Sequence, residues 1–264
     1  MLDDHVGRER LSVRHFYDSL AATYDLYYPD WEADARRQGQ VLYDLICAVL
    51  GSSPTRLLDC ACGIGTQILG VASIGAHVVG TDFSVEAVKR ARNETRFRGH
   101  EIGLAGADMR ALPFRNDVFD GIVCADNAVP HLLTQADLVQ GLSEMRRVLE
   151  PDGIVVITIR DYETARVRRP VSTQPSVRST PGGRVITFQL WHWHDDGELY
   201  DMEHFQLLPT TADTWNIRRR VTTYRALGRR QLQEGLGAAR FGDVRWHEPS
   251  ATGYFQPIVT ARAT

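Results

Sequence analysis

The sequence predicts a doubly wound α/β sheet, and three observations indicate this fold class. Apolar segments of strand length alternate with helical segments: strands near residues 56–60, 77–81, 102–106, 119–125 and 153–159, helices near 66–74, 84–97 and 136–149. A turn containing Gly63 and Gly65 joins the first strand to the next helix. Four successive strands end in carboxylates, at Asp59, Asp82, Asp108 and Asp126. Ligands bind at the carboxyl ends of parallel strands, so these aspartates mark the expected functional edge.

The residues before the first strand are predicted to be helical. Residues 11–50 contain helical segments with aromatic interruptions, and apolar residues at 41, 42, 45, 46, 49 and 50 form a stripe that ends at Gly51. We therefore divide the chain into an N-terminal helical lid or cap, residues 1–52, and a main domain, residues 53–264. A chain of 264 residues does not require a second independent domain.

The alternation stops after Arg160. Residues 169–184 are rich in Pro, Ser and Gly and are predicted to form a connection, whereas residues 184–209 alternate like two antiparallel strands around a turn at Asp196–Gly197. A helix at 229–240 and strands at 243–248 and 254–263 then complete a seven-stranded sheet. We expect an antiparallel β insertion at about 161–225 that covers the functional edge.

Composition excludes several classes of protein. The net charge of −3 gives no overall attraction to nucleic acid, and the arginine runs at 166–169 and 218–220 are read as solvated faces. No apolar run approaches the roughly 20 residues of a membrane helix and the N-terminus is charged, so we expect a cytoplasmic protein without membrane contact. The four cysteines lack C-x-x-C spacing and are read as reduced core residues, which predicts neither a disulfide nor a metal site.

The glycine turn is the most informative local motif. Gly63 and Gly65 carry no side chains, so main-chain N–H groups and a helix N-terminus approach a ligand closely. The third glycine of a dinucleotide fingerprint is replaced by Ile68, and no Gly-Lys-Ser/Thr follows as in a Walker A loop. The remaining pattern is D-x-x-x-G-x-G-T followed by a second strand that ends at Asp82. It fits a nucleoside whose ribose hydroxyls donate hydrogen bonds to the Asp82 carboxylate.

This ordered set of motifs resembles the class I S-adenosylmethionine-dependent methyltransferases over about residues 56–160. The resemblance implies a Rossmann-like sheet, S-adenosylmethionine as cofactor and S-adenosylhomocysteine as product. It also implies roles for residues at the strand ends. It assigns the cofactor loop to Asp59, Ala61, Gly63 and Gly65, the ribose to Asp82, and the adenine to Phe83, Asp108 and Met109. The alternatives are a core aromatic for Phe83 and a turn-capping carboxylate for Asp59 or Asp108.

The N-terminal half is similar to one branch of that family, the glycine and sarcosine N-methyltransferases. Arg37 falls where that branch places an arginine for the cofactor's carboxylate, and an aromatic segment matches the one that closes over the sulfonium: Tyr24, Tyr28 and Trp31. Asn127 and His131 match a second segment, and we expect Asn127 to contact the cofactor. Arg160 and Tyr162 match a third segment, in which the arginine of that branch binds the acceptor's carboxylate. Open alternatives are Arg36 in place of Arg37, an aromatic staple between helices, and a structural ion pair of Arg160 with Asp161, Glu163 or a neighbouring carboxylate.

The expected chemistry is in-line displacement at the sulfonium methyl carbon, without a metal. His131 is the first candidate base and Tyr24 orients the acceptor, while a satisfied core histidine is the alternative for His131. In the predicted insertion His192 and His194 share one face and Trp191 and Trp193 the other. One of these faces is expected to roof the cleft, which suits an acceptor larger than glycine.

The sequence therefore predicts a methyltransferase for a small nitrogen-containing metabolite, an amine or an indole-type ring methylated at nitrogen or carbon. Three alternatives stay open: a glycine/sarcosine N-methyltransferase, an RNA or protein methyltransferase, and a non-catalytic module that binds the cofactor. The absence of a basic patch counts against nucleic acid as a partner. The oligomeric state is undecided, with a homodimer as one alternative.

Overall fold

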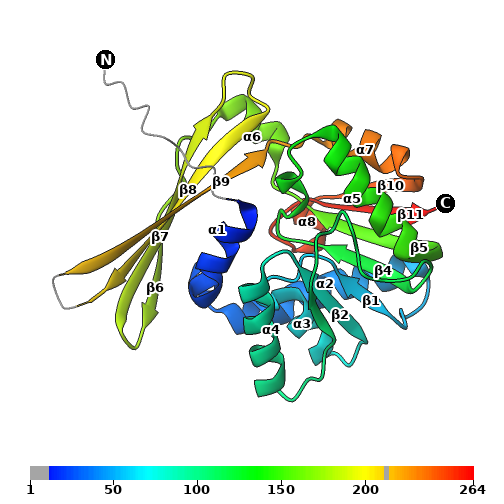
Figure 1. Ribbon diagram of the computed structural model, residues 1–264, viewed down its shortest axis with the longest axis horizontal. Coiled ribbons are helices and arrows are strands. Elements are labelled where there is room, and N and C mark those ends of the chain that lie inside the picture. Colours follow the sequence, from blue (N-terminus) through cyan, green and yellow to red (C-terminus); the bar gives the residue numbers. More distant parts are fainter. Residues whose placement is uncertain (1–11, 211–213) are drawn as a thin grey trace.

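The computed structural model describes residues 12–210 and 214–264, which form two β-sheets side by side (Figure 1). The larger sheet has seven strands in the order β10-β11-β5-β4-β1-β2-β3, and β11 runs antiparallel to both neighbours. Its strands are β1 (Leu57–Asp59), β2 (Val78–Asp82), β3 (Leu104–Gly106), β4 (Phe119–Cys124), β5 (Leu149–Thr158), β10 (Phe241–His247) and β11 (Ile258–Ala263). The predicted doubly wound seven-stranded fold is confirmed.

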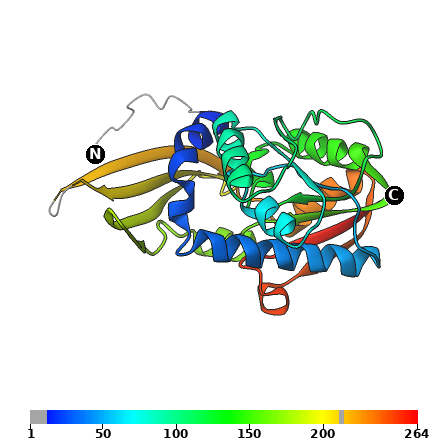
Figure 2. The ribbon, with the colours of Figure 1, turned by 90° about the horizontal axis from the view of Figure 1, so that it is seen from below.

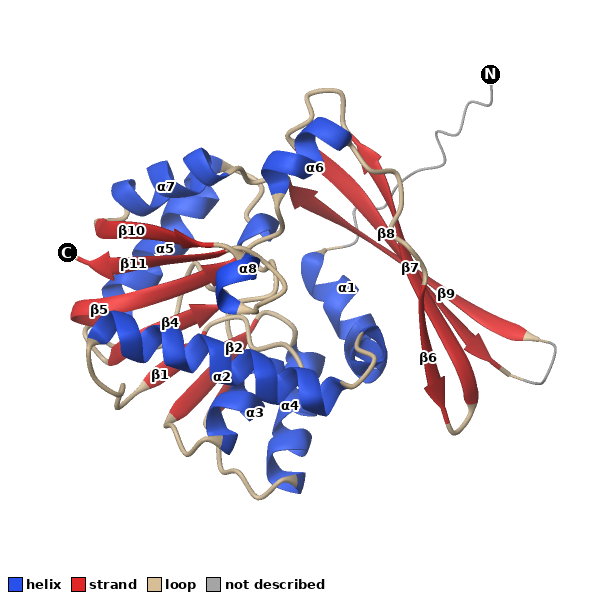
Figure 3. Ribbon diagram, turned by 180° about the vertical axis from the view of Figure 1, so that it is seen from behind, coloured by secondary structure: helices blue, strands red, loops and turns tan. Residues whose placement is uncertain are grey.

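Helices cover both faces of this sheet (Figures 2 and 3). Apolar side chains of α5 and α7 form one buried cluster with the sheet, and those of α2, α3 and α4 form a second. The helices are α1 (Val13–Leu20), α2 (Trp31–Leu50), α3 (Thr66–Ser73), α4 (Val85–Phe97), α5 (Gln135–Val148), α6 (Tyr162–Arg168), α7 (Arg229–Ala238) and α8 (Pro249–Thr252), with 3-10 turns η1 (Ala21–Tyr27) and η2 (Val129–His131). None of the helices in the described residues is both long and apolar enough to cross a membrane.

Two glycines let α2 and α3 touch through their main chains. A Cβ atom added at Gly70 would lie 2.0 Å from the carbonyl oxygen of Ala35, and one added at Gly39 would lie 2.4 Å from the carbonyl carbon of Gly70. Main-chain atoms cannot move aside as a flexible side chain does, so both positions require glycine. This contact fixes α3, which begins directly after the cofactor loop predicted from the sequence.

The smaller sheet is the predicted insertion, but it has four strands where the sequence analysis assigned two. They are antiparallel in the order β6-β7-β8-β9: β6 (Ser176–Thr180), β7 (Gly183–Trp193), β8 (Leu199–Pro209) and β9 (Trp215–Arg225). β6 lies in the stretch that the sequence predicted to be a connection, because Pro175 and Pro181 flank only five residues, of which Val177 alone is apolar. The sequence did not predict β9, because three consecutive arginines interrupt the alternation of apolar and polar residues that is typical of a strand.

One face of the smaller sheet lies against α1 and η1, which separate the two sheets (Figure 3). Trp191, Tyr200 and Tyr224 are buried on this inner side, whereas His192 pairs with Glu203 and His194 lies near Asp201 on the outer side. The imidazoles therefore point away from the larger sheet. Arg220 was predicted to be solvated, and this was wrong: it is buried on the inner face, with Arg219 exposed on the other.

Candidate functional site

The turn after β1 is built around Asp59. Its Oδ1 accepts a hydrogen bond from the main-chain N–H of Ala61 at 3.1 Å, and its Oδ2 is buried with no hydrogen-bond partner. Burial disfavours the charged carboxylate and raises the pKa of Asp59 to about 7. Gly63 and Gly65 both have positive φ, 52° and 101°. The space beside the Cα atom of Gly63 is open, since an added Cβ atom would meet no atom within 4 Å. The unpartnered oxygen lies buried beside this loop.

Asp82 at the end of β2 fastens the same turn. Its two carboxylate oxygens accept hydrogen bonds from the main-chain N–H groups of Gly63 and Ser84, each at 2.8 Å. Burial nevertheless raises the pKa of Asp82 to about 6. The carboxylate thus holds the glycine turn, the strand end and the start of α4 in one arrangement. Its place beside the turn suits the recognition of ribose hydroxyls.

A first cavity opens over this edge of the sheet. Among its lining residues are the predicted cofactor contacts Ala61, Gly63, Asp82, Phe83, Asp108 and Met109. Tyr24 and His131, predicted to be catalytic, line it as well. At the end of this cavity that the sequence predicts for adenine, Arg110 pairs with Asp108 at 2.7 Å and with Asp137 at 2.6 Å. Although burial opposes it, these hydrogen bonds from Arg110 lower the pKa of Asp108. Asp108 is therefore a fixed carboxylate.

A second cavity, of about 560 Å³, adjoins the first. It lies between the larger sheet's carboxyl edge, α1 and η1, and the inner face of the smaller sheet, which supplies Gln189, Met202 and Tyr224. Tyr28, Arg37 and Arg160 line this cavity and not the first. Arg37 is half exposed and pairs with Asp34 at 2.5 Å. The structure thus places Arg37 on the wall of the second cavity, whereas the sequence predicted it for the cofactor.

Asp126 and two tyrosines form the junction of the two cavities. Tyr17, Tyr24 and Asp126 line both. The Asp126 carboxylate accepts hydrogen bonds from the hydroxyls of Tyr28 at 2.9 Å and Tyr24 at 3.2 Å, and burial raises its pKa. Asp126 follows β4 and has a φ of 56°, a left-handed backbone conformation that is uncommon for a residue other than glycine.

Tyr17 connects this junction to His131. The Tyr17 hydroxyl lies 2.8 Å from His131 Nε2 and 3.0 Å from the Tyr224 hydroxyl. Burial lowers the pKa of His131 to about 3, so its imidazole is neutral at physiological pH. His131 does not line the second cavity, because Tyr17 lies between them.

Arg160 follows β5 and presents a half-buried cation to the second cavity. Its guanidinium donates to the Tyr200 hydroxyl at 2.9 Å and lies 5.0 Å from the Trp191 ring centroid and 5.2 Å from that of Tyr224. No carboxylate among the described residues forms an ion pair with it, so the predicted alternative of a structural pair with Asp161 or Glu163 is not observed. The stacked rings and the hydroxyl compensate part of the desolvation of this charge.

Four residues predicted for the cofactor lie outside both cavities: Trp31, Asp59, Gly65 and Asn127. Trp31 is buried, donates to the Thr66 hydroxyl at 2.9 Å and packs with Ile64 and Leu69, which matches the staple alternative. Asn127 accepts from the main-chain N–H of Arg160 and donates to Tyr162, each at 3.0 Å. Both residues support the site from behind. Asp59 and Gly65 shape the turn itself.

Sequence reasoning missed Tyr17 and gave Asp126 no individual role. From the smaller sheet it expected the Trp191 or the His192 face to cover the cleft, but it did not name Gln189, Met202 or Tyr224. Tyr17 and Tyr24 are seven residues apart, two helical turns on one face, and this spacing was an available signal. Tyr224 and Gln189 carried no signal, because strand pairing over a long separation brings them to the cavity.

Comparisons with known proteins agree with this geometry. A family model described as "Methyltransferase domain" matches residues 57–153. A glycine/sarcosine N-methyltransferase of Halorhodospira halochloris is 30% identical over 137 residues, 51% of this chain and 49% of that protein. A demethylmenaquinone methyltransferase of Thermus thermophilus is 34% identical over 145 residues, 53% of this chain and 62% of that protein. The chain thus matches about half the length of the first relative.

Solved structures share the fold over nearly the whole chain. DesVI of Streptomyces venezuelae has a TM-score of 0.76 at 21% identity, covering 91% of this chain and 97% of that one. CalS10 of Micromonospora echinaspora, described as an amino pentose methyltransferase with bound S-adenosylmethionine, has a TM-score of 0.71 at 23% identity, covering 92% and 95%.

The fold and its cofactor edge define a Rossmann-like domain that binds a nucleoside cofactor. The family match is more specific: residues 57–153 match a methyltransferase domain of the class I S-adenosylmethionine-dependent type. S-adenosylmethionine is the cofactor of this family, and the first cavity has the residues to hold it.

Proposed function

We propose that the protein transfers a methyl group from S-adenosylmethionine to a nitrogen atom of a small-molecule acceptor bound in the second cavity. One observation carries the proposal: the two cavities meet at Tyr17, Tyr24 and Asp126. A donor in the first cavity and an acceptor in the second share this junction, which is the arrangement that direct transfer requires. The cofactor supplies an electrophilic methyl group on a cationic sulfur.

The first cavity suits the cofactor from the adenine end to the junction. Phe83 and Met109 provide apolar contacts for a purine, and Asp108 is a fixed acceptor for its amino group. Asp82 lies where ribose hydroxyls would donate. Tyr24 and Tyr17 present aromatic rings at the junction, and cation–π contact with a sulfonium contributes on the order of 0.5–2 kcal/mol.

The junction favours an amine as the acceptor. Asp126 offers carboxylate oxygens that accept from an N–H group, and Tyr24 and Tyr28 hold this carboxylate in place. The sugar N-methyltransferase KedS8 of Streptoalloteichus has the same fold at 18% identity with a TM-score of 0.72, and this likeness adds support for a nitrogen acceptor. We propose that Asp126 orients the nitrogen, together with Tyr24.

Arg160 favours an acceptor that also carries an anionic group. Its guanidinium is half-buried, faces the second cavity and forms no ion pair with a described carboxylate. The glycine/sarcosine N-methyltransferase relatives support a carboxylate here. The cavity volume of about 560 Å³ and its aromatic walls suit a larger body than glycine, such as an indole-type ring. Glycine or sarcosine is the second candidate.

His131 suits a positioning role better than that of a base. Its pKa of about 3 makes the imidazole a weak proton acceptor at neutral pH, and Tyr17 covers its Nε2. We propose that His131 and Tyr224 fix the Tyr17 hydroxyl at the junction. A neutral amine needs alignment more than deprotonation, so this arrangement is sufficient for N-methylation.

The test is calorimetric titration with S-adenosylmethionine and S-adenosylhomocysteine, followed by mass spectrometry with a panel of acceptors. The panel contains glycine, sarcosine, indoles, tryptophan-containing cyclic dipeptides and amino sugars. We expect binding of both nucleosides and a gain of one methyl mass on an amine that bears an anion. Methylation of total RNA or of a protein instead would refute the small-molecule acceptor, and absence of nucleoside binding would refute the cofactor assignment.

A further inference from the structure

Residues 13–28, which we call the strap, form one wall of the cofactor cavity. The strap consists of α1, η1 and Tyr28 and lies between the two sheets (Figure 1). Val13, Tyr17, Ala21 and Tyr24 face the first cavity from the strap, and the glycine turn faces it from the larger sheet. A cofactor in this cavity would lie between the strap and the turn.

Polar contacts fasten the strap to the methyltransferase domain. Asp18 accepts hydrogen bonds from the Ser84 hydroxyl at 2.6 Å and the Glu86 main-chain N–H at 3.2 Å, at the start of α4. Arg90, also on α4, donates to the carbonyl oxygen of Ala21 at 2.7 Å and pairs with Asp25 at 2.8 Å. The strap is therefore docked beside the ribose end of the cavity.

A second set of contacts fastens the strap to the smaller sheet. Thr23 and Gln206 exchange two hydrogen bonds, of 2.8 and 3.0 Å. Arg220 donates to the carbonyl oxygen of Ser19 at 2.8 Å, and Arg178 donates to the carbonyl oxygen of Asp25 at 2.5 Å. The three side chains from the smaller sheet, Gln206, Arg220 and Arg178, line neither cavity. Their contacts are with the strap.

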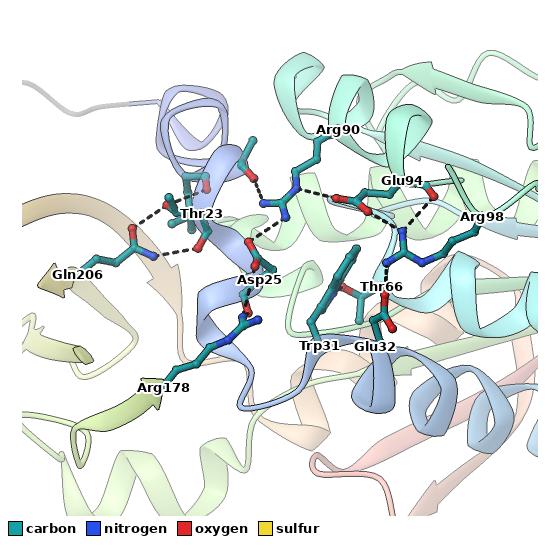
Figure 4. Close-up of polar contacts among 12 residues, drawn as sticks. Thr23, Asp25, Trp31, Glu32, Thr66, Arg90, Glu94, Arg98, Arg178 and Gln206 are labelled. Atoms are coloured by element: carbon teal, nitrogen blue, oxygen red, sulfur yellow. Dashed lines mark hydrogen bonds and ion pairs between the residues drawn. The ribbon is translucent and has the colours of Figure 1, made fainter. Parts of the chain in front are cut away.

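Asp25 belongs to both sets. One carboxylate oxygen pairs with Arg90 at 2.8 Å and the other with Arg178 at 3.3 Å, so a single side chain joins α4, the strap and β6 (Figure 4). The side chains of all three residues are between 20% and 24% exposed, which limits screening by salt but does not abolish it. Loss of either arginine leaves the Asp25 carboxylate attached on one side only.

We propose that the strap is a lid over the cofactor and that Asp25 is its latch, so that the smaller sheet controls how fast the cofactor enters and leaves. The lid is closed in this structure, because both sets of contacts are formed. Passage of the cofactor past the strap requires these contacts to open. The proposal depends on cofactor binding alone, and the identity of the acceptor does not affect it.

Kinetics distinguish a latch from a merely structural contact. If the latch holds a closed state that opens briefly, weakening it raises the open fraction, and both the association and dissociation rates rise together. The equilibrium constant then changes little. A contact that only supports the cavity wall would, when lost, lower affinity through faster dissociation without faster association.

The test uses stopped-flow binding of S-adenosylhomocysteine to the full chain. We expect Arg178→Ala to raise both rate constants about three- to tenfold, the range for a partly exposed charged contact, with the dissociation constant changed less than about twofold. Arg184→Ala is the matched control: it removes the same charge from an exposed position at the start of the neighbouring strand β7 and should leave both rates unchanged.

Asp25→Asn provides a second variant. It should raise both rates at least as much as Arg178→Ala, because it weakens the contacts to both arginines. Adding Arg178→Ala to Asp25→Asn should then have less effect than in the wild type, since the two act on one contact. Unchanged rates in Arg178→Ala with an unchanged melting temperature would overturn the proposal. So would faster dissociation with unchanged association.

Discussion

The two cavities share residues of the strap and Asp126, but the rest of their walls comes from different parts of the chain. The first is formed by short segments at successive strand ends, with the strap as a further wall, and its central support is a main-chain turn fastened by Asp82. The second is formed by side chains from the strap, α2, the end of β5, the smaller sheet and the loop near Phe255. Main-chain geometry therefore determines the donor side, whereas packing of distant side chains determines the acceptor side. A substitution should affect one function and spare the other.

Substitution of Arg160 should give the largest difference between the effect on acceptor turnover and the effect on cofactor affinity. We expect Arg160→Gln to lower kcat/KM for an anionic acceptor about 100-fold, because the acceptor's charge loses its partner in a desolvated site. Affinity for S-adenosylhomocysteine should stay within about twofold, as Arg160 does not line the first cavity. Steady-state kinetics and calorimetry on the same sample measure both. Equal losses of turnover and cofactor affinity would contradict the division.

Asp82 should show the opposite pattern. In Asp82→Ala the Gly63 and Ser84 N–H groups lose their shared acceptor, and the ribose loses its own, so we expect about 100-fold weaker binding of S-adenosylhomocysteine. Asp195→Ala, at an exposed turn of the insertion, serves as the control and should bind normally. Calorimetry measures the affinity of both variants. A loss of affinity smaller than about fivefold in Asp82→Ala would mean that the main-chain turn keeps its shape without the carboxylate.

Gly70 tests the main-chain support behind the cofactor turn. Gly70→Ala would push a methyl group into the carbonyl of Ala35, and we expect it to lower the free energy of unfolding by about 2–4 kcal/mol. Gly237→Ala, in α7 with no atom within 4 Å of the added methyl group, should instead be neutral or stabilising by up to about 1 kcal/mol. Urea denaturation of both variants compares them, and similar values would argue against a tight helix contact.

His131 lies at the boundary between the two sides. We expect His131→Ala to lower kcat about tenfold while cofactor affinity falls less than about threefold, because the Tyr17 hydroxyl loses one of its two partners. The neutral state of His131 also predicts that its protonation produces no step in turnover between pH 6 and 8. An equal loss of turnover and affinity would instead assign His131 to cofactor binding.

Asp59 gives the smallest effect, which depends on pH. Its pKa of about 7 lies above the usual value, so the folded protein retains a proton that the unfolded chain releases, and stability decreases as pH rises from about 4 to about 7. Asp59→Asn removes this loss and should be about 1–2 kcal/mol more stable than the wild type at pH 8, without cofactor, and equal to it near pH 4. Thermal unfolding at both pH values measures it, with Asp195→Asn as control.

The sequence predicted the central sheet and most of the donor side because their signals are local. Asp59, Gly63 and Asp82 lie at strand ends that apolar runs identify, and the structure brings Asp82, Phe83, Asp108 and Met109 to one cavity as expected. Trp31 and Asn127 were placed correctly in the chain but face the supporting layer, because one-dimensional patterns do not fix the direction of a side chain.

The acceptor side was less predictable for a physical reason. Tyr224 reaches the junction only because β9 pairs with β8 across the insertion, and Gln189 only because β7 pairs with β8 on its other side. Such pairings depend on long-range register, which arginine-rich β9 does not reveal. The buried Arg220 illustrates the same limit: its neighbour Arg219 is exposed, and alternation assigns a face only once the strand is recognised.

The pairing of β11 directly with β5 has a modular consequence. Ile258 to Arg262 of β11 bond to Thr158 to Ile154 of β5, so every neighbouring pair in the seven-stranded sheet forms without the residues between Arg160 and α7. The intervening stretch is therefore one continuous insert that the strand pairing of the larger sheet does not require. We expect its replacement to change the walls of the second cavity and the contacts of the strap, while the hydrogen-bonded scaffold beneath the first cavity stays intact.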